Sequence, residues 1–511
     1  MNDWTAGYVA DIGYTYGYYT ELNPLRVKLA FLNQGLQCPE MATACELGFG
    51  QGLSANLHAA ASAIRWSGTD FNPSQAGYAQ ELAQASGSGA QLHDEAFAEF
   101  AQRPDLPGFD YIGVHGIWSW ISDENRAVIV DFVRRKLKVG GILYISYNTL
   151  PGWAAFAPMR HLMTEHAEVL GSEGRGIVSR IDGAMDFAEK LLATNPAFAR
   201  ANPLVADRLK HMKGHNRHYL AHEYFNRDWH PMHFATMAGW LEAAKLQYAC
   251  SANYLDQVDV VNLTPEQQVF IKEIPDPMFR QTVRDFMVNQ QFRKDYWVKG
   301  ARRLSALEQM EALRNVRLIL TTARVDVSLK VTGAVGEATM SEAIYNPILD
   351  ALADHRIHSI GQLEQALKDR NITFGLIVEA VLLLTGAGHL QLAQDDQAAS
   401  KARKTCERLN QYLMLKARSS NDVSYLASPV TGGGIAVNRF QQLFLLARSQ
   451  GQKQPAEWAQ SAWQLLAVQG QTLIKDGKGL PTPEENLSEL TAQAKTFAEA
   501  QLPILKSLQI A

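Results

Sequence analysis

The sequence predicts an α/β fold with a parallel sheet at its amino-terminal end, followed by mostly helical regions. Two observations carry this prediction. Short apolar, strand-like segments alternate with helix-like segments over residues 1–155, which is typical of a parallel sheet with right-handed crossovers. A glycine-rich turn at residues 46–52 also joins the first strand-like segment to the first helix-like segment. Beyond residue 155 the apolar pattern becomes mainly helical.

Each element of the first region has its own signal. Strand-like apolar segments occupy residues 43–47, 64–69, 90–93, 111–114 and 142–147. Helix-like segments occupy residues 53–63, 74–85 and 124–137. We expect the last of these helices to end before Gly140 and Gly141, because glycine commonly follows the end of a helix.

The remainder of the chain divides into three predicted regions. Residues 156–318 form a mostly helical middle region that contains many aromatic residues. Residues 319–395 show the element order of a winged-helix unit, with helices at 344–353, 360–367 and 374–384 and strands near 328–331 and 389–392. The third of these helices contains no Lys or Arg, which favours packing or a partner contact over DNA binding. Residues 396–511 form a carboxy-terminal helical region that is interrupted at 429–434.

The composition is that of an ordinary globular protein. Of its 511 residues, 47% are hydrophobic, and the net charge of −4 disfavours a nucleic-acid partner. The longest apolar run, near residues 376–384, is interrupted by Glu379 and is shorter than the roughly 20 residues of a membrane span. No basic and apolar leader opens the sequence, and the four cysteines show no CxxC spacing. We therefore expect a cytoplasmic protein, not inserted in a membrane, that is a monomer or a homodimer.

The glycine turn identifies a ligand site. Gly48, Gly50 and Gly52 let the backbone approach a ligand that a Cβ atom would block. Nicotinamide-binding folds show a similar turn, so other residues must decide between the two classes. Glu46 lies two residues before the first glycine, where methyltransferases of the seven-strand class use an acid near the aminoacyl end of the cofactor. Asp70 closes the second strand, where a carboxylate can accept both ribose hydroxyls.

A third signal, the turn at residues 137–141, resembles the Leu-x-Pro-Gly-Gly turn of these enzymes, with Val139 in place of proline. The three signals predict a seven-stranded, Rossmann-like S-adenosylmethionine (SAM) methyltransferase domain, with S-adenosylhomocysteine (AdoHcy) as the product. By resemblance to that fold, Asp94 lies near the adenine, with Glu95 or Phe97 beside it. The predicted cofactor-binding residues are Glu46, Gly48, Gly50, Gly52, Asp70, Phe71, Asp94, Glu95, Phe97, His115 and Gly116.

The catalytic candidates come from three places. The loop after the fourth strand, which begins at His115, should face the methyl group and the acceptor. The amino-terminal tyrosines include Tyr16 and Tyr19, and aromatic faces attract a sulfonium or alkylammonium group. A packed amphipathic strand or helix explains these tyrosines equally well. His222 is the fourth candidate. No Asp-Pro-Pro-Tyr tetrapeptide and no cysteine follow the fourth strand, which disfavours methylation of nucleic-acid bases.

Histidines are concentrated between residues 211 and 233. His211, His215, His218 and His222 would share one face of a helix. Imidazole is a common metal ligand, but no cysteine and no HExxH motif accompany these residues. We therefore predict a surface or packing cluster and no metal.

Several segments together resemble bacterial methyltransferases that carry a methyltransferase regulatory domain. The segments are residues 13–24, 46–52, 115–120, 146–153 and 219–226. The best-understood relatives are the rickettsial-type protein-lysine methyltransferases that modify outer-membrane proteins. The resemblance implies SAM-dependent methylation of an amine, namely the lysine side chains of a protein substrate. The alternatives are N- or O-methylation of a small molecule or natural-product peptide, and a binding protein that has lost catalysis.

Overall fold

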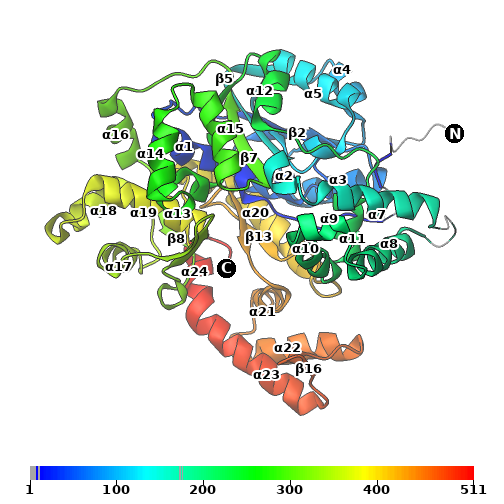
Figure 1. Ribbon diagram of the computed structural model, residues 1–511. Helices are drawn as coiled ribbons and strands as arrows, with labels where there is room; N and C mark the ends of the chain where they lie inside the picture. Colours follow the sequence, from blue (N-terminus) through cyan, green and yellow to red (C-terminus); the bar gives the residue numbers. More distant parts are fainter. Residues whose placement is uncertain (1–6, 10–11, 172–173, 175) are drawn as a thin grey trace.

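The computed structural model describes residues 7–9, 12–171, 174 and 176–511 (Figure 1). Its central feature is a seven-stranded sheet with the strand order β3-β2-β1-β4-β5-β7-β6. The strands are β1 (Thr43–Leu47), β2 (Arg65–Thr69), β3 (Gln91–His93), β4 (Phe109–Val114), β5 (Leu137–Asn148), β6 (Gln247–Ser251) and β7 (Phe292–Val298). All neighbours are parallel except β7, which runs antiparallel to both β5 and β6. The predicted α/β fold is confirmed.

Both faces of the sheet are covered, so its central strands consist largely of buried residues. Successive side chains of a strand point to opposite faces. Tyr111 therefore joins the core beside α1 (Pro24–Asn33), whereas Ile112 joins the core beside α5 (Asp123–Lys136). The helices α2 (Leu53–Ala61) and α3 (Pro73–Ser86) pack against each other and connect the first three strands.

The sheet crosses the predicted domain boundary at residue 155, because β6 and β7 come from the middle region. Three consecutive charged residues, 293–295, lie within β7, although most of this strand is buried. Arg293 binds Asp295 at 2.9 Å, and it also binds Asp285. All three side chains are at most 6% exposed, so they pair inside the protein. The catalytic fold therefore extends to about residue 299.

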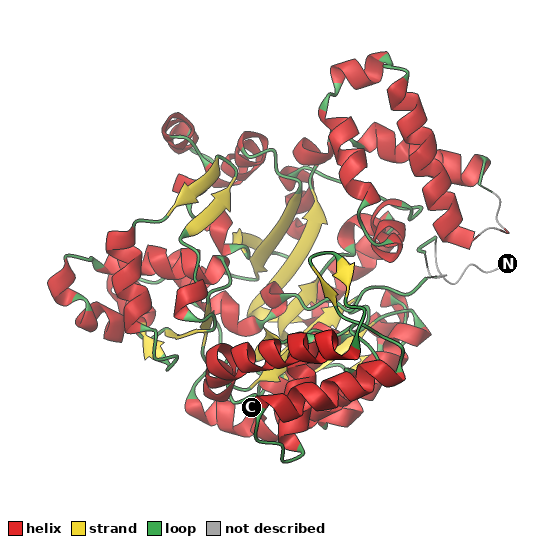
Figure 2. Ribbon diagram, turned by 90° about the horizontal axis from the view of Figure 1, so that it is seen from below, coloured by secondary structure: helices red, strands yellow, loops and turns green. Residues whose placement is uncertain are grey.

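A lobe of helices lies between β5 and β6. It contains α6 (Leu150–Trp153), α7 (Ala157–Val169), α8 (Gly176–Ala193), α9 (Ala197–Ala201), α10 (Leu204–Lys213) and α11 (Arg217–Tyr224). These helices gather to one side of the sheet and have an apolar core of their own (Figures 1 and 2). The chain returns to the sheet through α12 (Phe234–Glu242), and α14 (Pro265–Glu273) and α15 (Pro277–Met287) lie between β6 and β7.

The next region contains the elements expected of residues 319–395. Helices α17 (Glu342–Ala351), α18 (Ile360–Ala366) and α19 (Phe374–Gly386) lie close to the predicted positions. A three-stranded sheet is formed by β11 (His358–Ser359), β8 (Arg317–Leu320) and β12 (Leu390–Leu392). Its middle strand begins before the predicted boundary at 318, so the boundary falls inside this strand. The winged-helix assignment stays a prediction.

The carboxy-terminal region covers the catalytic domain. The long helix α20 (Asp396–Lys416) and the hairpin of β13 (Tyr425–Ser428) and β14 (Gly433–Ala436) pack on α2. All nine residues of α2 are buried as a result, and Thr405 Oγ1 donates to the Ala60 carbonyl. The predicted interruption at 429–434 contains the turn of this hairpin and the first two residues of β14. Beyond it, α21 (Arg439–Ser449), α22 (Pro455–Val468) and α23 (Pro483–Thr496) extend away from the sheet, and α24 (Leu502–Ser507) ends the chain (Figure 1).

No helix among the described residues is both long enough and apolar enough to cross a membrane.

Candidate functional site

The glycine turn connects β1 to α2 and forms the floor of a pocket. Gly48, Gly50 and Gly52 have φ angles of 71°, 57° and 67°, which side chains other than glycine rarely adopt. A Cβ atom at Gly48 would lie 2.8 Å from Cγ2 of Ile117, across the pocket. A Cβ atom at Gly52 would lie 2.4 Å from Cβ of Ala79 in α3. Gly48 therefore keeps the pocket open, whereas Gly52 lets two helices pack closely.

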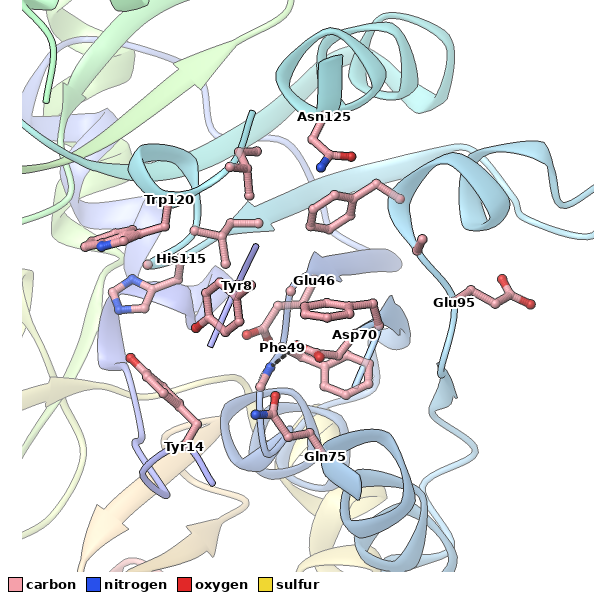
Figure 3. Close-up of a pocket in the computed structure, with 18 of the residues that line it drawn as sticks. Tyr8, Tyr14, Glu46, Phe49, Asp70, Gln75, Glu95, His115, Trp120 and Asn125 are labelled. Atoms are coloured by element: carbon pink, nitrogen blue, oxygen red, sulfur yellow. Dashed lines mark hydrogen bonds between the residues drawn. The ribbon is translucent and has the colours of Figure 1, made fainter. Parts of the chain in front are cut away.

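Asp70 ties the end of β2 to this turn. Its Oδ2 accepts a hydrogen bond from the Gly50 amide at 2.8 Å, shown as a dashed line in Figure 3. Its Oδ1 accepts from the Asn72 amide at 3.0 Å. Burial raises the pKa of Asp70 to about 6, although both amides oppose the shift. The free lone pairs of this fixed carboxylate are available to ligand hydroxyls.

Glu46 is buried at the end of β1 and lacks a complete set of partners. Its Oε2 has no hydrogen-bond partner among the described residues. Burial and the nearby Asp70 raise the pKa of Glu46 to about 8. A buried carboxyl without partners is costly, and a cationic ligand group would remove that cost.

The pocket contains all but two of the predicted cofactor-binding residues. Those that line it are Glu46, Gly48, Gly50, Asp70, Phe71, Glu95, Phe97, His115 and Gly116. Gly52 serves helix packing instead. Asp94 is exposed and does not line the pocket, although residues 95–97 directly after it do. Tyr8 and Tyr14 of the tyrosine-rich amino-terminal segment also line the pocket. Further lining residues were not among the predicted cofactor-binding residues, and they are Phe49, Gln75, Ala96, Ile117, Trp120, Ile121, Ser122, Asn125 and Asp228.

These residues fit SAM. Asp70 offers a carboxylate to the ribose hydroxyls, and the orphaned Glu46 carboxyl suits the ammonium of the aminoacyl group. The side chains of Phe49, Phe97 and Ile117 supply apolar surface for a purine. Because its glycines have no Cβ atom, the glycine turn lets the backbone approach the ligand closely.

His115 lies at the end of β4, deep in the pocket. Its Nδ1 is 2.7 Å from the Tyr144 hydroxyl and 3.3 Å from Ser146 Oγ. The Tyr19 ring lies over it, with the ring centres 3.8 Å apart. Burial lowers the pKa of His115 to about 3, so its imidazole is neutral at physiological pH.

The other two catalytic candidates lie elsewhere. Tyr16 packs against Tyr78 of α3, with ring centres 5.1 Å apart, and does not line the pocket. The amino-terminal segment crosses from the pocket to α3, so Tyr14 and Tyr19 line the pocket while Tyr16 does not. His222 is buried behind the pocket, where its Nε2 lies 3.0 Å from the Ile12 carbonyl oxygen. These positions favour structural roles for Tyr16 and His222.

A second cavity adjoins the first, and we call it the acceptor cavity. The two cavities share Tyr14, Tyr19, His115 and Trp120 as lining residues. The acceptor cavity has a volume of about 770 Å³ and is enclosed by the end of β5, by α10 and α11, and by residues 289–292. It lies between the sheet and the helical lobe.

Glu223 is the one carboxylate among the described residues that line the acceptor cavity. Burial raises its pKa to about 7, although Arg208 and the Asn148 side chain oppose the shift. The Trp120 Nε1 group donates a hydrogen bond to the Glu223 carbonyl oxygen at 3.0 Å. In the sequence, Glu223 is marked only as part of the segment 219–226 that resembles related methyltransferases, and no local pattern places this acid in a cavity.

The clustered histidines separate in the structure. His211 and His215 line the acceptor cavity, whereas His218 Nδ1 lies 2.9 Å from the Gly13 carbonyl oxygen. His222 contacts the same amino-terminal segment. Within the part of the chain that the structure describes, no group of three or more His, Cys, Asp or Glu side chains could hold a metal ion.

Comparison with protein families matches residues 216–299 to the predicted methyltransferase regulatory domain. The matched segment begins just before α11, which carries Glu223, and ends just after β7. It therefore supplies one wall of the acceptor cavity and two strands of the sheet.

Two known proteins resemble this chain along nearly its whole length, and a third resembles about half of it. An uncharacterized protein from Synechocystis sp. is 40% identical over 512 residues, which cover 99% of both chains. An uncharacterized protein from Rickettsia prowazekii is 25% identical over 280 residues, which cover 54% of this chain and 49% of that protein. The structure of PKMT2 from Rickettsia typhi in complex with AdoHcy superposes with a TM-score of 0.71, covering 98% of this chain and 100% of that chain at 16% identity.

The strand order and the acid-flanked glycine turn define a class I methyltransferase fold. The chain belongs to the SAM-dependent methyltransferases that carry a methyltransferase regulatory domain.

Proposed function

We propose that this chain transfers a methyl group from SAM to an amine, and that the amine is the side chain of lysine in a protein substrate. The observation that carries the proposal is the acceptor cavity, which joins the cofactor pocket through Tyr14, Tyr19, His115 and Trp120. At about 770 Å³ it has room for a long side chain and part of its backbone.

The cofactor side of the proposal rests on the fit described above and on a structural neighbour. That neighbour, PKMT2 from Rickettsia typhi, forms a complex with AdoHcy, the product of SAM. By analogy, Asp70 would hold the ribose, and Glu46 would hold the aminoacyl end. When bound, SAM supplies an electrophilic methyl group, whose bond to sulfur breaks as the bond to the acceptor nitrogen forms.

The residues of the chain then have three tasks. The cavity walls align the amine with the methyl group, and alignment accounts for much of the acceleration in such a displacement. Tyr19 and His115 form the floor where the two cavities meet, and the neutral His115 adds no positive charge there. Partial burial among the aromatic side chains lowers the pKa of a bound amine, which eases the loss of the proton that must leave before methylation.

The test uses the full-length chain and radiolabelled SAM. Incubation with a bacterial lysate, followed by mass spectrometry of the labelled species, should find methyl groups on lysine nitrogens of protein. The matched control is Asp70→Asn, which keeps the shape of the side chain and should label nothing above background. Label confined to small molecules or natural-product peptides would support the alternative acceptor class and overturn the protein-lysine proposal. Label on nucleic acid, or on no acceptor at all, would also contradict it.

A further inference from the structure

The acceptor cavity holds a half-buried acid, Glu223, that the reaction described so far does not use. We propose that Glu223 receives the acceptor amine: its carboxylate binds the ammonium form and takes the proton that the amine must lose before methylation. The inference rests on the proposed function, since it names a residue for that reaction. The cofactor pocket itself does not include Glu223.

The surroundings of Glu223 suit an alkylammonium group. Aromatic rings line the same cavity, and a cation is attracted to the faces of such rings. These rings are those of Tyr14, Tyr19, Trp120, Trp153, Phe156, Tyr219, Tyr224 and Phe292. A single carboxylate among aromatic rings binds an ammonium ion by charge and a methylated ammonium ion by ring contact. The cavity is therefore suited to retain an amine through more than one round of methylation.

Hydrogen bonds hold the backbone around Glu223 in place. Trp120 reaches its carbonyl oxygen from the loop after β4, at 3.0 Å. One residue earlier, His222 contacts the Ile12 carbonyl oxygen, also at 3.0 Å. One residue later, the Tyr224 carbonyl oxygen accepts from Arg160 Nε at 2.8 Å. Three separate segments thus hold the turn of α11 from which the Glu223 side chain extends, and a rigid support of this kind suits a group that must meet a substrate atom.

Several titratable groups face Glu223 from the surrounding elements. They are Tyr8, Tyr14 and Tyr19 of the amino-terminal segment, His115 after β4, Arg208 and His211 of α10, and His215, Tyr219, His222 and Tyr224 in or next to α11. Arg208 is the one permanent cation of this set, and its guanidinium stacks 3.8 Å from the Trp153 ring centre. Burial outweighs the effect of Arg208, and the pKa of Glu223 rises to about 7. A base with a pKa near the working pH is well matched to proton transfer.

The proton balance is simple. The ammonium nitrogen gives one proton to a Glu223 carboxylate oxygen, which leaves a neutral amine and a neutral carboxyl group. The amine nitrogen then gains the methyl carbon and one positive charge, while the methyl carbon leaves sulfur. Glu223 returns its proton to solvent through the open cavity before the next turnover.

The test compares Glu223→Gln with the native chain in two measurements. In the first, n-butylammonium is titrated into the full-length chain saturated with AdoHcy, and binding is followed by calorimetry. We expect at least tenfold weaker binding by Glu223→Gln and unchanged AdoHcy affinity. The control is Glu165→Gln, an exposed acid of α7, which should behave as the native chain does. Equal binding by Glu223→Gln, or no binding by the native chain, would overturn the proposal.

The second measurement is the pH profile of methyl transfer to the labelled protein acceptor. For the native chain, kcat/KM should fall as the pH drops below about 7, because Glu223 becomes protonated. Glu223→Gln should lose roughly 100-fold in kcat, as expected for the loss of a general base, and should lose this acid limb. If amines are labelled equally by both chains, the inference fails and the proposed function stands. If the native chain labels no amine, the proposed function fails and the butylammonium titration alone decides the role of Glu223.

Discussion

The cofactor pocket and the acceptor cavity meet at Tyr19 and His115 but are built in different ways. The cofactor pocket consists mainly of strand ends and the turns that follow them, so its acids, Glu46 and Asp70, lie next to recognisable segments. The acceptor cavity is assembled from the amino-terminal segment, the end of β5, the helical lobe and residues 289–292. Its acid, Glu223, comes from a helix far from the glycine turn in the sequence.

This difference means that the two walls should tolerate substitutions to different degrees. The wall of the cofactor pocket is shaped by the backbone of the sheet, which can change little without altering the fold. The acceptor wall is made of side chains on helices that pack against the sheet, and these can change without disturbing the strand order. We expect substitutions in the first wall to affect cofactor affinity and substitutions in the second to affect turnover.

The largest expected effect is the loss of cofactor binding in Asp70→Ala. Removing this carboxylate deletes the acceptor for two ribose hydroxyls and the anchor of the Gly50 amide. Hydrogen bonds to a charged group contribute roughly 1.5–3 kcal/mol each, so the affinity for AdoHcy should fall at least about 100-fold. Isothermal titration calorimetry measures this, and circular dichroism checks that the variant is folded.

The matched control for Asp70→Ala is Asp94→Asn. Asp94 is exposed and does not line the pocket, so the affinity of this variant for AdoHcy should stay within about twofold of the native value. Unchanged AdoHcy affinity in a folded Asp70→Ala chain would show that Asp70 does not bind the cofactor. A large loss of AdoHcy affinity in Asp94→Asn would show that Asp94 does.

The Glu46 carboxylate should strengthen cofactor binding and lower the stability of the cofactor-free chain. Its carboxyl has an ordinary pKa of 4.5 and a pKa of about 8 in the folded chain, so folding favours the protonated form. The cofactor-free chain therefore loses stability as the pH rises from about 4.5 to about 8. Glu46→Gln removes this penalty, and its unfolding free energy at pH 8 should exceed the native value by up to roughly 4 kcal/mol.

Denaturant unfolding at pH 5 and pH 8 measures the effect of Glu46→Gln. The two chains should differ little at pH 5, and the variant should bind SAM more weakly at either pH. A variant that is less stable than the native chain at pH 8 would contradict the assigned environment of Glu46.

Gly52→Ala should damage folding more than binding. The new Cβ would lie 2.4 Å from Ala79 Cβ, and the φ angle of 67° disfavours alanine. Overpacking and the left-handed conformation together cost about 2–3 kcal/mol. Gly77→Ala in α3 is the control, because nothing lies within 4 Å of its new Cβ, and it should not destabilise the chain. Thermal unfolding of the two variants tests the comparison, and equal melting temperatures would contradict it.

The smallest expected effect distinguishes two amino-terminal tyrosines. Tyr19 lies over His115 and lines both cavities, so Tyr19→Phe should lower kcat by roughly tenfold without a matching loss of SAM affinity. Tyr16→Phe should leave kcat within about twofold, because Tyr16 packs on Tyr78 outside both cavities. Steady-state kinetics on the labelled acceptor would show the opposite order if Tyr16 were catalytic.

Much of the cofactor pocket could be predicted from the sequence. The glycine turn, Glu46 and Asp70 are signalled by short segments, because the ends of parallel strands meet at one edge of a sheet. The strands β6 and β7 were not predicted. β7 carries charged residues at 293–295, which is unusual for a buried strand, and Arg293 pairs with Asp295 and with Asp285 in the interior.

The acceptor side could not be predicted in the same way. The role of Tyr16, Tyr19 or His222 depends on the path of the amino-terminal segment across α3 and α11, which no local pattern encodes. Glu223 becomes conspicuous only when the helical lobe folds against the sheet and buries it. Long-range packing, rather than spacing along the chain, creates this wall.

The most direct test of the account is a crystal structure of the full-length chain with AdoHcy. We predict that the ribose hydroxyls contact Asp70, that the aminoacyl end lies at Glu46, and that the sulfur faces the junction at Tyr19 and His115, with Glu223 across the acceptor cavity. A ligand bound outside this pocket, or one whose sulfur faces away from the acceptor cavity, would contradict the account.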